Sequence, residues 1–466
     1  MSNRAMNLAC LISLSLPCLG QSAVVFQNST DARTGAVSSV QNDDAGSQAA
    51  QNRTNQQSPK VLIQLSVKDA EAIALKHNPA ISVARLNALA SQQMTREVRS
   101  ALWPQAYANM TAVDARNNSR ITAGGLNNPI IYTRAAAGAT VSQLITDFGH
   151  TTNLATSARL QAKAEEQNAA ATQNDVLLAV DQAFYIALET RAVLSVAQQT
   201  VASRQLLADQ VSALTKSKLK SDLDLSFANV NLAQAKLLYL DALNNDKAAI
   251  ATLSAILGYP TLENFALLND AEPLTPPPAE VDQLIADAFA KRPEILALEF
   301  ESESAEKLHQ SDRDQMFPTI SALAAYGDSP VRDDRVYGPY AAVGVNVQIP
   351  VFNGFLFSAK SRESDLRAQA IRQRLTDLRN RISRDVRTSW LAASTAFDRV
   401  TVSEQLLAQA NQALDLAETR YKLGLSSIVE LSQAQLQQTQ GEIGNAQAGY
   451  AYRLALSVLR YQTTGL

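Results

Sequence analysis

The chain has 466 residues, of which 46% are hydrophobic and 18% charged, a composition that excludes disorder over the whole length. Its 41 Lys and Arg residues against 44 Asp and Glu residues leave a formal net charge of −3, so it lacks the basic excess of nucleic-acid-binding proteins. Beyond the N-terminal segment nothing approaches the ~20 uninterrupted apolar residues of a transmembrane helix, so any membrane contact would require strands.

The N-terminal segment 1–22 has the pattern of a secretory signal peptide. Arg4 supplies a positive charge, an apolar run follows it, and Gly20 and Ser22 are small residues placed for cleavage. The alternative is a buried N-terminal helix. The next segment, 23–60, is rich in Gln, Asn, Ser and Thr without periodicity, which predicts a polar disordered tail.

Both cysteines, Cys10 and Cys18, lie in the signal-like segment. A cysteine after an apolar run can be a site of lipid attachment, and Cys18 is the candidate, although Pro17 before it is unfavourable for that modification. Without the signal the chain would have no cysteine, and therefore no disulfide and no thiol chemistry.

Proline landmarks recur at a constant distance along the chain. Pro79 and Pro293 each interrupt a helical pattern, and Pro104 and Pro318 each follow an aromatic residue at the end of that pattern. The two members of each pair are 214 positions apart. Such a recurrence predicts an internal duplication.

The duplication divides the chain into two halves, 61–270 and 281–466, joined by a Pro-rich linker at 271–280. Three consecutive prolines in the linker cannot continue a helix. Each half is predicted to contain a helix, two strands and a long helical hairpin.

The predicted strands follow the aromatic-proline landmarks, and a loop rich in Gly and Pro or Asn separates the two strands of each half. The strands are 105–113 and 132–146 in the first half and 319–326 and 340–349 in the second, with loops at 114–131 and 327–339. Each strand is about as long as the ~9–11 residues needed to cross a bilayer. Four strands cannot close a barrel, and an open edge is not tolerated in lipid, so membrane insertion would require oligomerisation; a trimer would pool twelve.

The helical hairpins are predicted at 150–257 and 356–462. In the first, alternating steps of four and three from Val176 to Val211 visit mostly small apolar residues, which predicts a coiled-coil seam. A helix of ~65 residues would be roughly 100 Å long, far longer than a globular core requires.

Motifs typical of enzymes are missing. His77, His150 and His309 are scattered, and we interpret them as polar surface or helix-end residues, not metal ligands. The chain has no phosphate-binding Gly-rich loop and no Gly-x-Ser-x-Gly nucleophile motif. The sequence therefore predicts no enzyme, no metal and no cofactor.

The ends of the two hairpins have different sequences. In the run 421–431, Gly424 is placed to end one helix in a left-handed conformation, and Ser426 or Ser427 is placed to cap the next. The corresponding run 216–224 lacks the glycine and is strongly basic. These ends are either simple turns or the far tip of a rod at which a partner docks.

The landmarks together carry a family resemblance. They are the two proline helix starts, the aromatic-proline stops, the Gln-x-x-x-x-x-Gly segments ending at Gly149 and Gly354, and the run 421–431. In this order and in duplicate, they make the chain resemble the TolC-like outer-membrane efflux protein family over about residues 62–464.

The resemblance implies a mainly α fold with a β-barrel portion, in which the duplicated helix–strand–strand–hairpin units form a trimeric helical tunnel and a shared twelve-stranded outer-membrane barrel. It implies a passive exit duct in the outer membrane of a Gram-negative-type bacterium, with a large periplasmic portion. The implied partners are two further copies, a periplasmic adaptor, an inner-membrane transporter and membrane lipid, without nucleic acid. The alternative is a periplasmic coiled-coil adaptor or scaffold without a membrane span. A surface enzyme or adhesin on a barrel anchor would need a passenger domain, and no stretch of sufficient length is left to hold one.

The resemblance also implies where the duct closes and where the adaptor binds. The gate candidates are Asp224, Glu430, Tyr421, Ser426 and Gln433. The adaptor-contact candidates are Lys216, Lys218, Leu219, Lys220, Leu423, Gly424 and Leu425. Ser426 stands where relatives have an arginine of the closing clamp, and Gln433 stands where they have a second aspartate. The expected constriction is therefore cation-selective and held closed less tightly.

Overall fold

The computed structural model describes residues 63–464 apart from 117–132, 262, 264, 270–272, 333 and 335–337. The signal-like segment with Cys18, the polar tail that follows it, and most of the predicted loop 114–131 lie outside the described residues. All described residues belong to one compact unit, Lys60–Leu466.

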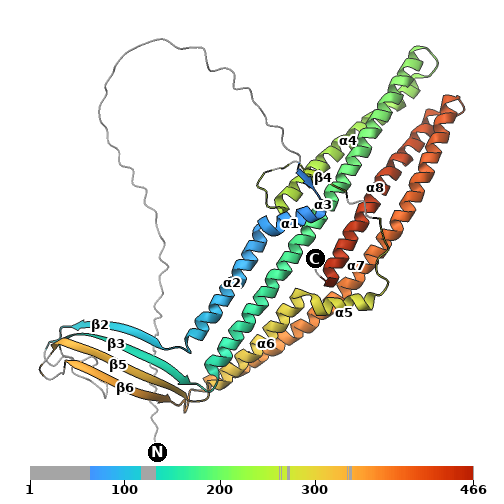
Figure 1. The fold of residues 1–466 in the computed structure, drawn as a ribbon. Coiled ribbons are helices and arrows are strands. Elements are labelled where there is room, and N and C mark those ends of the chain that lie inside the picture. Colours follow the sequence, from blue (N-terminus) through green and yellow to red (C-terminus); the bar gives the residue numbers. More distant parts are fainter. Residues whose placement is uncertain are drawn as a thin grey trace, which may run out of the picture. The chain divides into compact units, whose positions relative to one another are not determined.

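One order of elements occurs twice: two short helices, two strands and two long helices (Figure 1). The first set is α1 Val67–His77, α2 Pro79–Ser100, β2 Gln105–Val113, β3 Arg134–Thr146, α3 His150–Lys216 and α4 Asp222–Ile256. The second set is α5 Val281–Lys291, α6 Pro293–Asp314, β5 Thr319–Arg332, β6 Pro339–Gln348, α7 Leu356–Lys422 and α8 Ile428–Thr464. Two further short strands, β1 Ile63–Leu65 and β4 Phe265–Leu267, pair in parallel.

The proline landmarks set where α2 and α6 begin. Pro79 and Pro293 are the first residues of these helices, where the missing N–H costs nothing because it would have no intrahelical partner. Asn78 caps α2 by accepting a hydrogen bond from the Ala80 N–H at 2.8 Å. At the equivalent kink Arg292 donates instead to Glu294 and to Gln462 of α8, both at 2.7 Å.

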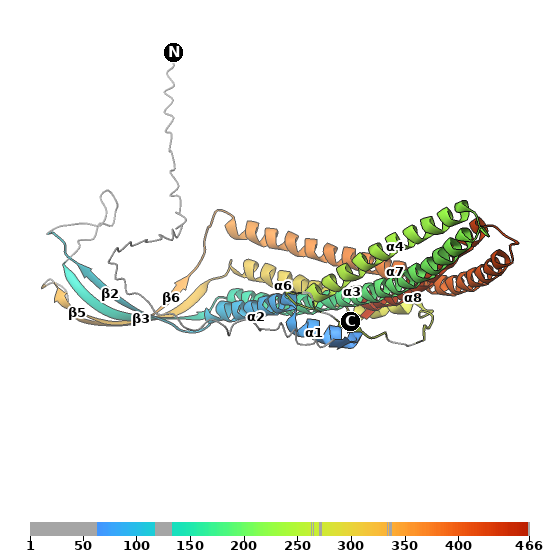
Figure 2. The same cartoon turned by 90° about the horizontal axis from the view of Figure 1, so that it is seen from above.

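The longer strands form one antiparallel sheet in the order β2-β3-β5-β6 (Figure 1). This sheet extends from one end of the helices (Figure 2). Its edges are therefore one strand of each set, β2 and β6, and all ten residues of β6 are exposed. An exposed strand edge presents unpaired N–H and C=O groups and is a template for pairing with another chain.

The second set corrects one expectation, because β5 continues to Arg332 instead of ending at residue 326. The predicted loop 327–339 is correspondingly shorter, and β6 begins at Pro339. Pro330 is tolerated because it lies in the irregular stretch between the paired residues Asp328 and Val331, where it need not donate to a ladder.

Gly327, which the sequence placed in the predicted loop, lies within β5 at a point where two glycines face a tyrosine. Gly138, Gly327 and Tyr340 are neighbours across β3, β5 and β6. A Cβ atom at either glycine would collide with the Tyr340 hydroxyl, so the aromatic side chain uses the space that the glycines leave. At Gly327 a Cβ would also lie 2.7 Å from the Ala137 carbonyl oxygen, a backbone atom that cannot move aside cheaply.

The long helices pack as two hairpins, α3 with α4 and α7 with α8, and α3 also contacts α8. Eight of the seam positions expected in α3 are buried: Val176, Val180, Ala183, Ala187, Ala197, Arg204, Ala208 and Val211. Neither α3, α4 nor α7 contains glycine or proline, whereas α8 contains Gly441, Gly444 and Gly449.

The Pro-rich linker lies along the second hairpin. Trp390 of α7 donates its indole N–H to the Pro278 carbonyl at 2.6 Å, and the Tyr452 hydroxyl of α8 donates to the Thr275 carbonyl. Among the described residues, no helix is both long and apolar enough to cross a membrane.

Candidate functional site at the hairpin ends

The two hairpin ends have the same backbone geometry despite their different sequences. Lys218 and Gly424 both have positive φ, 61° and 74°. In each turn the N–H of the residue after the left-handed one donates to a carbonyl in the last turn of the preceding helix. The Leu219 N–H donates to the Leu214 carbonyl at 2.9 Å, and the Leu425 N–H donates to the Arg420 carbonyl at 2.8 Å. These bonds satisfy carbonyls that the last helical turn leaves unpaired.

Serine starts the returning helix in both turns. The Asp224 N–H donates to Ser221 Oγ at 3.1 Å, and the Glu430 N–H donates to Ser427 Oγ at 3.4 Å. In the first turn the Asp224 carboxylate also accepts from the Ser221 N–H at 3.1 Å, which completes a capping box. Asp224 therefore stabilises its own helix, whatever further role its charge has.

Three of the predicted site residues lie together. The Lys220 ammonium lies 3.9 Å from the centre of the Tyr421 ring, so the first hairpin end contacts the second. Burial raises the pKa of the Tyr421 hydroxyl, and the nearby Asp224 carboxylate raises it further. Tyr421 is therefore a neutral, buried side chain bordered by one cation and one anion.

The other gate candidates are not part of this group. Glu430 forms an ion pair with Arg420, with 3.4 Å between Oε1 and Nε. The Ser426 hydroxyl is buried without a hydrogen-bond partner among the described residues, and Gln433 is exposed on α8. An arginine is thus present at the second hairpin end, but it pairs with the carboxylate of its own hairpin.

The adaptor-contact candidates are exposed leucines and lysines. Leu219, Leu423 and Leu425 are 71%, 68% and 67% exposed, and Lys216 and Lys218 are also exposed. Sequence reasoning missed Leu223, which is 65% exposed and adds to the same end. Grouped exposed apolar side chains are typical of protein interaction sites.

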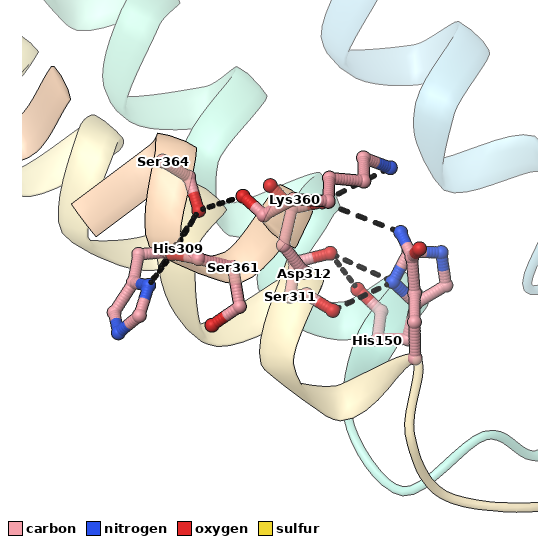
Figure 3. Close-up of polar contacts among 8 residues, drawn as sticks. His150, His309, Ser311, Asp312, Lys360, Ser361 and Ser364 are labelled. Atoms are coloured by element: carbon pink, nitrogen blue, oxygen red, sulfur yellow. Dashed lines mark hydrogen bonds and ion pairs between the residues drawn. The ribbon is translucent and has the colours of Figure 1, made fainter. Parts of the chain in front are cut away.

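At the other end of the helices, next to the sheet, a polar cluster joins α3, α6 and α7 (Figure 3). Ser311 of α6 donates its hydroxyl to the carbonyl of His150, the first residue of α3, at 2.9 Å. His150 Nδ1 is also 2.9 Å from the Ser311 carbonyl oxygen. Asp312 is buried and pairs with Lys360 of α7 at 3.1 Å.

His309 makes the corresponding contact between α6 and α7, with Nδ1 3.0 Å from the Ser361 carbonyl oxygen (Figure 3). His150 is the helix-end residue that the sequence suggested, but its connecting role was missed because Ser311 lies 161 positions away. The described residues contain no group of three or more His, Cys, Asp or Glu side chains that could hold a metal ion.

Comparison with known proteins decides the family. The family model for outer membrane efflux proteins matches residues 72–259 and 284–463, which covers both sets of elements. The chain belongs to the outer membrane efflux protein family. This confirms the resemblance that the sequence landmarks carried.

Relatives and solved structures agree with this assignment. The outer membrane efflux protein BepC of Brucella suis is 24% identical, over 65% of this chain and 66% of its own length. The outer membrane protein TolC of Escherichia coli is 24% identical, over 80% of this chain and 77% of its own length. The fold is similar to the crystal structure of the Campylobacter jejuni CmeC outer membrane channel, with a TM-score of 0.75, 14% identity and coverage of 86% of this chain and 85% of that chain.

Proposed function

We propose that this protein is the passive outer-membrane exit duct of a tripartite export system, conducting substrates from an inner-membrane pump and a periplasmic adaptor to the outside. The observation that carries the proposal is the family match over both sets of elements. In each set, strands precede a helical hairpin, so one chain combines a sheet with long helices. The proposal includes no catalytic step and no cofactor, in keeping with relatives that are named as efflux and channel proteins.

The duct would be a homotrimer. The sheet of one copy has the two free edges β2 and β6, and pairing β6 of one copy with β2 of the next would leave no edge exposed to lipid. Three copies would give a twelve-stranded barrel, and their six hairpins would form the tunnel. Because of the internal duplication, the two halves of each chain would contribute hairpins of similar shape to the tunnel wall.

The hairpin ends would form the periplasmic end of the duct. The exposed leucines and lysines of both turns would contact the adaptor, and Asp224 and Glu430 would place carboxylates near the trimer axis. Like charges crowded on an axis repel one another and attract cations. Ser426 contributes no charge at this end, and Arg420 is already paired with Glu430.

The test of this function combines location, conductance and partner capture. The full-length protein expressed in a Gram-negative host is expected in the outer-membrane fraction, with an electrophoretic mobility that changes on heating. In planar bilayers it is expected to form ion-conducting pores. Recovery as a soluble periplasmic protein without conductance would instead support the coiled-coil adaptor or scaffold reading.

Partner capture uses the absence of cysteine after position 18. Single cysteines at Lys218 and Leu425 are expected to crosslink to a periplasmic adaptor in cells. A cysteine at Tyr326, on β5 of the sheet, is the matched control and is expected to capture no adaptor. Equal capture from all three positions would contradict adaptor binding at the hairpin ends.

A further inference from the structure

Each free edge of the sheet has a counterpart in the middle of the sheet. The edge strand β6 has the place in the second set of elements that β3 has in the first, and the edge strand β2 has the place in the first set that β5 has in the second. β3 and β5 pair with each other, antiparallel, at the centre of the sheet. The pairing that the free edges lack is therefore already present once within the chain, between the equivalent strands.

The helices that follow the strands show which residues of the two sets are equivalent. α3 and α7 both have 67 residues, and their first residues are 206 positions apart. Two consecutive residues with positive φ precede each helix, Phe148 and Gly149 in one set and Gly354 and Phe355 in the other. The helices therefore place β6 206 positions after β3, whereas the glycines Gly149 and Gly354 are 205 positions apart. These two spacings give registers that differ by one residue.

The faces of the sheet decide between these two registers. One row of directly paired side chains crosses all four strands on one face and is wholly apolar: Ala106, Val141, Ala324 and Val343. Because side chains alternate along a strand, Met110 of β2 and Val347 of β6 also lie on this face, and Asn109 lies on the other. The spacing of 206 places Val347 opposite Met110 of a second copy, and the spacing of 205 places it opposite Asn109. Directly opposite residues share a face, so only the first register keeps the two faces continuous.

The first register also matches the side chains by their chemistry. Val347 and Met110 are 52% and 87% exposed in one copy, and each would cover the other. On the opposite face, Asn346 would lie beside Thr111 of the second copy. Cross-strand pairs of this kind stabilise a sheet when apolar side chains meet apolar ones and polar side chains meet polar ones.

The same equivalence extends to the helices. Within one copy α3 packs against α6, and the buried hydroxyl oxygens of Ser157 and Ser304 are 3.0 Å apart. The equivalent positions are Glu363 of α7 and Ala90 of α2, and both residues are exposed. The helix faces that are buried between the two sets therefore have exposed counterparts on α7 and α2.

We propose that β6 and α7 of one copy bind β2 and α2 of a second copy, in the register in which β3 and α3 bind β5 and α6 within the chain. Val347 then lies opposite Met110 of the second copy, and Glu363 lies beside Ala90 of the second copy. This inference rests on the homotrimer of the proposed function and specifies which residues meet in it. Another strand is the occupant that fits the edge, because it pairs the free N–H and C=O groups of β6.

Disulfide formation between introduced cysteines tests this register in the purified full-length protein, which has no native cysteine after position 18. Directly opposite residues of antiparallel strands have Cα atoms ~4.5–5.5 Å apart, within the reach of a disulfide. In one copy β3 and β5 separate β2 from β6, so a disulfide between positions 110 and 347 can form only between copies. The double variant Met110→Cys with Val347→Cys is expected to give covalent dimers and trimers on mild oxidation.

The double variant Asn109→Cys with Val347→Cys is the matched control, because its thiols lie on opposite faces in the proposed register. It is expected to give about ten times less crosslinked product. Ala90→Cys with Glu363→Cys tests the helices and is also expected to crosslink between copies. Its control is Ala90→Cys with Arg362→Cys, because adjacent residues of a helix do not point to the same side. Each single-cysteine variant is expected to give no product.

The mass of the protein in detergent, measured by light scattering, separates this inference from the proposed function. Trimers that crosslink through positions 110 and 347 but not through 109 and 347 support both. Trimers in which the 109 and 347 pair crosslinks as well as or better than the 110 and 347 pair overturn the register and leave the exit duct standing. Trimers that crosslink through the strands but not through positions 90 and 363 overturn the helix contact. Monomers without crosslinks overturn the inference, and they overturn the exit duct as well if the protein conducts no ions.

Discussion

Lys218 and Gly424 occupy equivalent positions at the two hairpin ends, and both have a left-handed backbone conformation. For an L-residue with a Cβ atom, this conformation costs about 1 kcal/mol, whereas glycine adopts it freely. Lys218→Gly is therefore expected to stabilise the first hairpin end by about 1 kcal/mol, and Gly424→Ala to destabilise the second by a similar amount. A Cβ at Gly424 would meet no atom within 4 Å, so the loss would come from the backbone alone.

Hydrogen exchange at the amides of the two turns measures this difference locally. Slower exchange is expected around Lys218→Gly and faster exchange around Gly424→Ala, with each unchanged hairpin as the internal reference. Faster exchange in both variants would show that the Lys218 side chain stabilises its turn more than its backbone strain destabilises it.

Arg204 is buried at a seam position of α3 and donates to the Gln435 carbonyl of α8 at 2.9 Å. Burial lowers the pKa of its guanidinium, and the charges of Glu418 and Glu442 offset this only in part. We therefore expect Arg204→Met, which keeps the volume, to raise stability by about 1 kcal/mol, and Arg204→Ala to lower it by about 2–4 kcal/mol through a cavity. Thermal unfolding followed by circular dichroism compares the two.

Arg381 supplies the control for this comparison, because it pairs with Asp377 on the exposed face of α7. Arg381→Met is expected to change stability by less than about 1 kcal/mol. If Arg204→Met instead unfolds at a clearly lower temperature than wild type, the hydrogen bonds of Arg204 stabilise the fold by more than the burial of its charge destabilises it.

Glu71 of α1 and the buried Asp181 of α3 form a carboxyl pair. Burial, followed by the charge of Asp181, raises the pKa of Glu71 from 4.5 to about 7, although Lys68 and Arg460 act in the opposite direction. Burial also raises the pKa of Asp181. Between these pH values the folded protein holds protons that the unfolded chain has released, so this contribution to stability is complete in acid and is lost as pH rises through about 7.

The melting temperature of the wild type is therefore expected to fall between about pH 5 and about pH 8. Glu71→Gln, which stays neutral throughout, should flatten this slope and melt higher than wild type at the alkaline end. Parallel curves for the two proteins would exclude Glu71 as the source of the dependence.

The proposed gate predicts opposite effects for two neighbouring residues. Glu430→Gln, alone or with Asp224→Asn, is expected to reduce cation selectivity in planar bilayers, because carboxylates are lost from the periplasmic end. Arg420→Gln is expected to increase it, because Arg420 no longer pairs with Glu430. Asparagine at position 224 keeps an oxygen for the Ser221 cap, so the variant separates charge from helix capping. Unchanged cation selectivity in the double variant would show that the carboxylates of Asp224 and Glu430 do not form the gate.

Local signals made the helices and turns predictable. The starts of α2 and α6 are marked by Pro79 and Pro293. The left-handed turn at position 424 is marked by its glycine, the residue type that favours this conformation. The seam of α3 was visible because its small apolar residues repeat at helical spacing.

Contacts between distant segments were not predictable in the same way. The extension of β5 passes through Gly327, where Tyr340 of another strand fills the space beside the glycine. The contact of Lys220 with Tyr421 joins the two hairpins, and a single sequence carries no signal that pairs these residues. Lys218 adopts a left-handed conformation that its residue type disfavours. Its sequence therefore gives no sign of the turn, which becomes clear only because Gly424 has the same conformation at the equivalent position.

The glycines of α8 have a mechanical consequence. Three of the four long helices contain no glycine, and in α8 a Cβ at Gly444 or Gly449 would meet no atom within 4 Å. Glycine lowers the resistance of a helix to bending, because it adds backbone freedom and no side-chain packing. A force applied at the hairpin ends is therefore expected to flex α8 while α3 and α4 move as a stiff pair. The two hairpins of one chain thus differ in compliance, although they share one backbone plan.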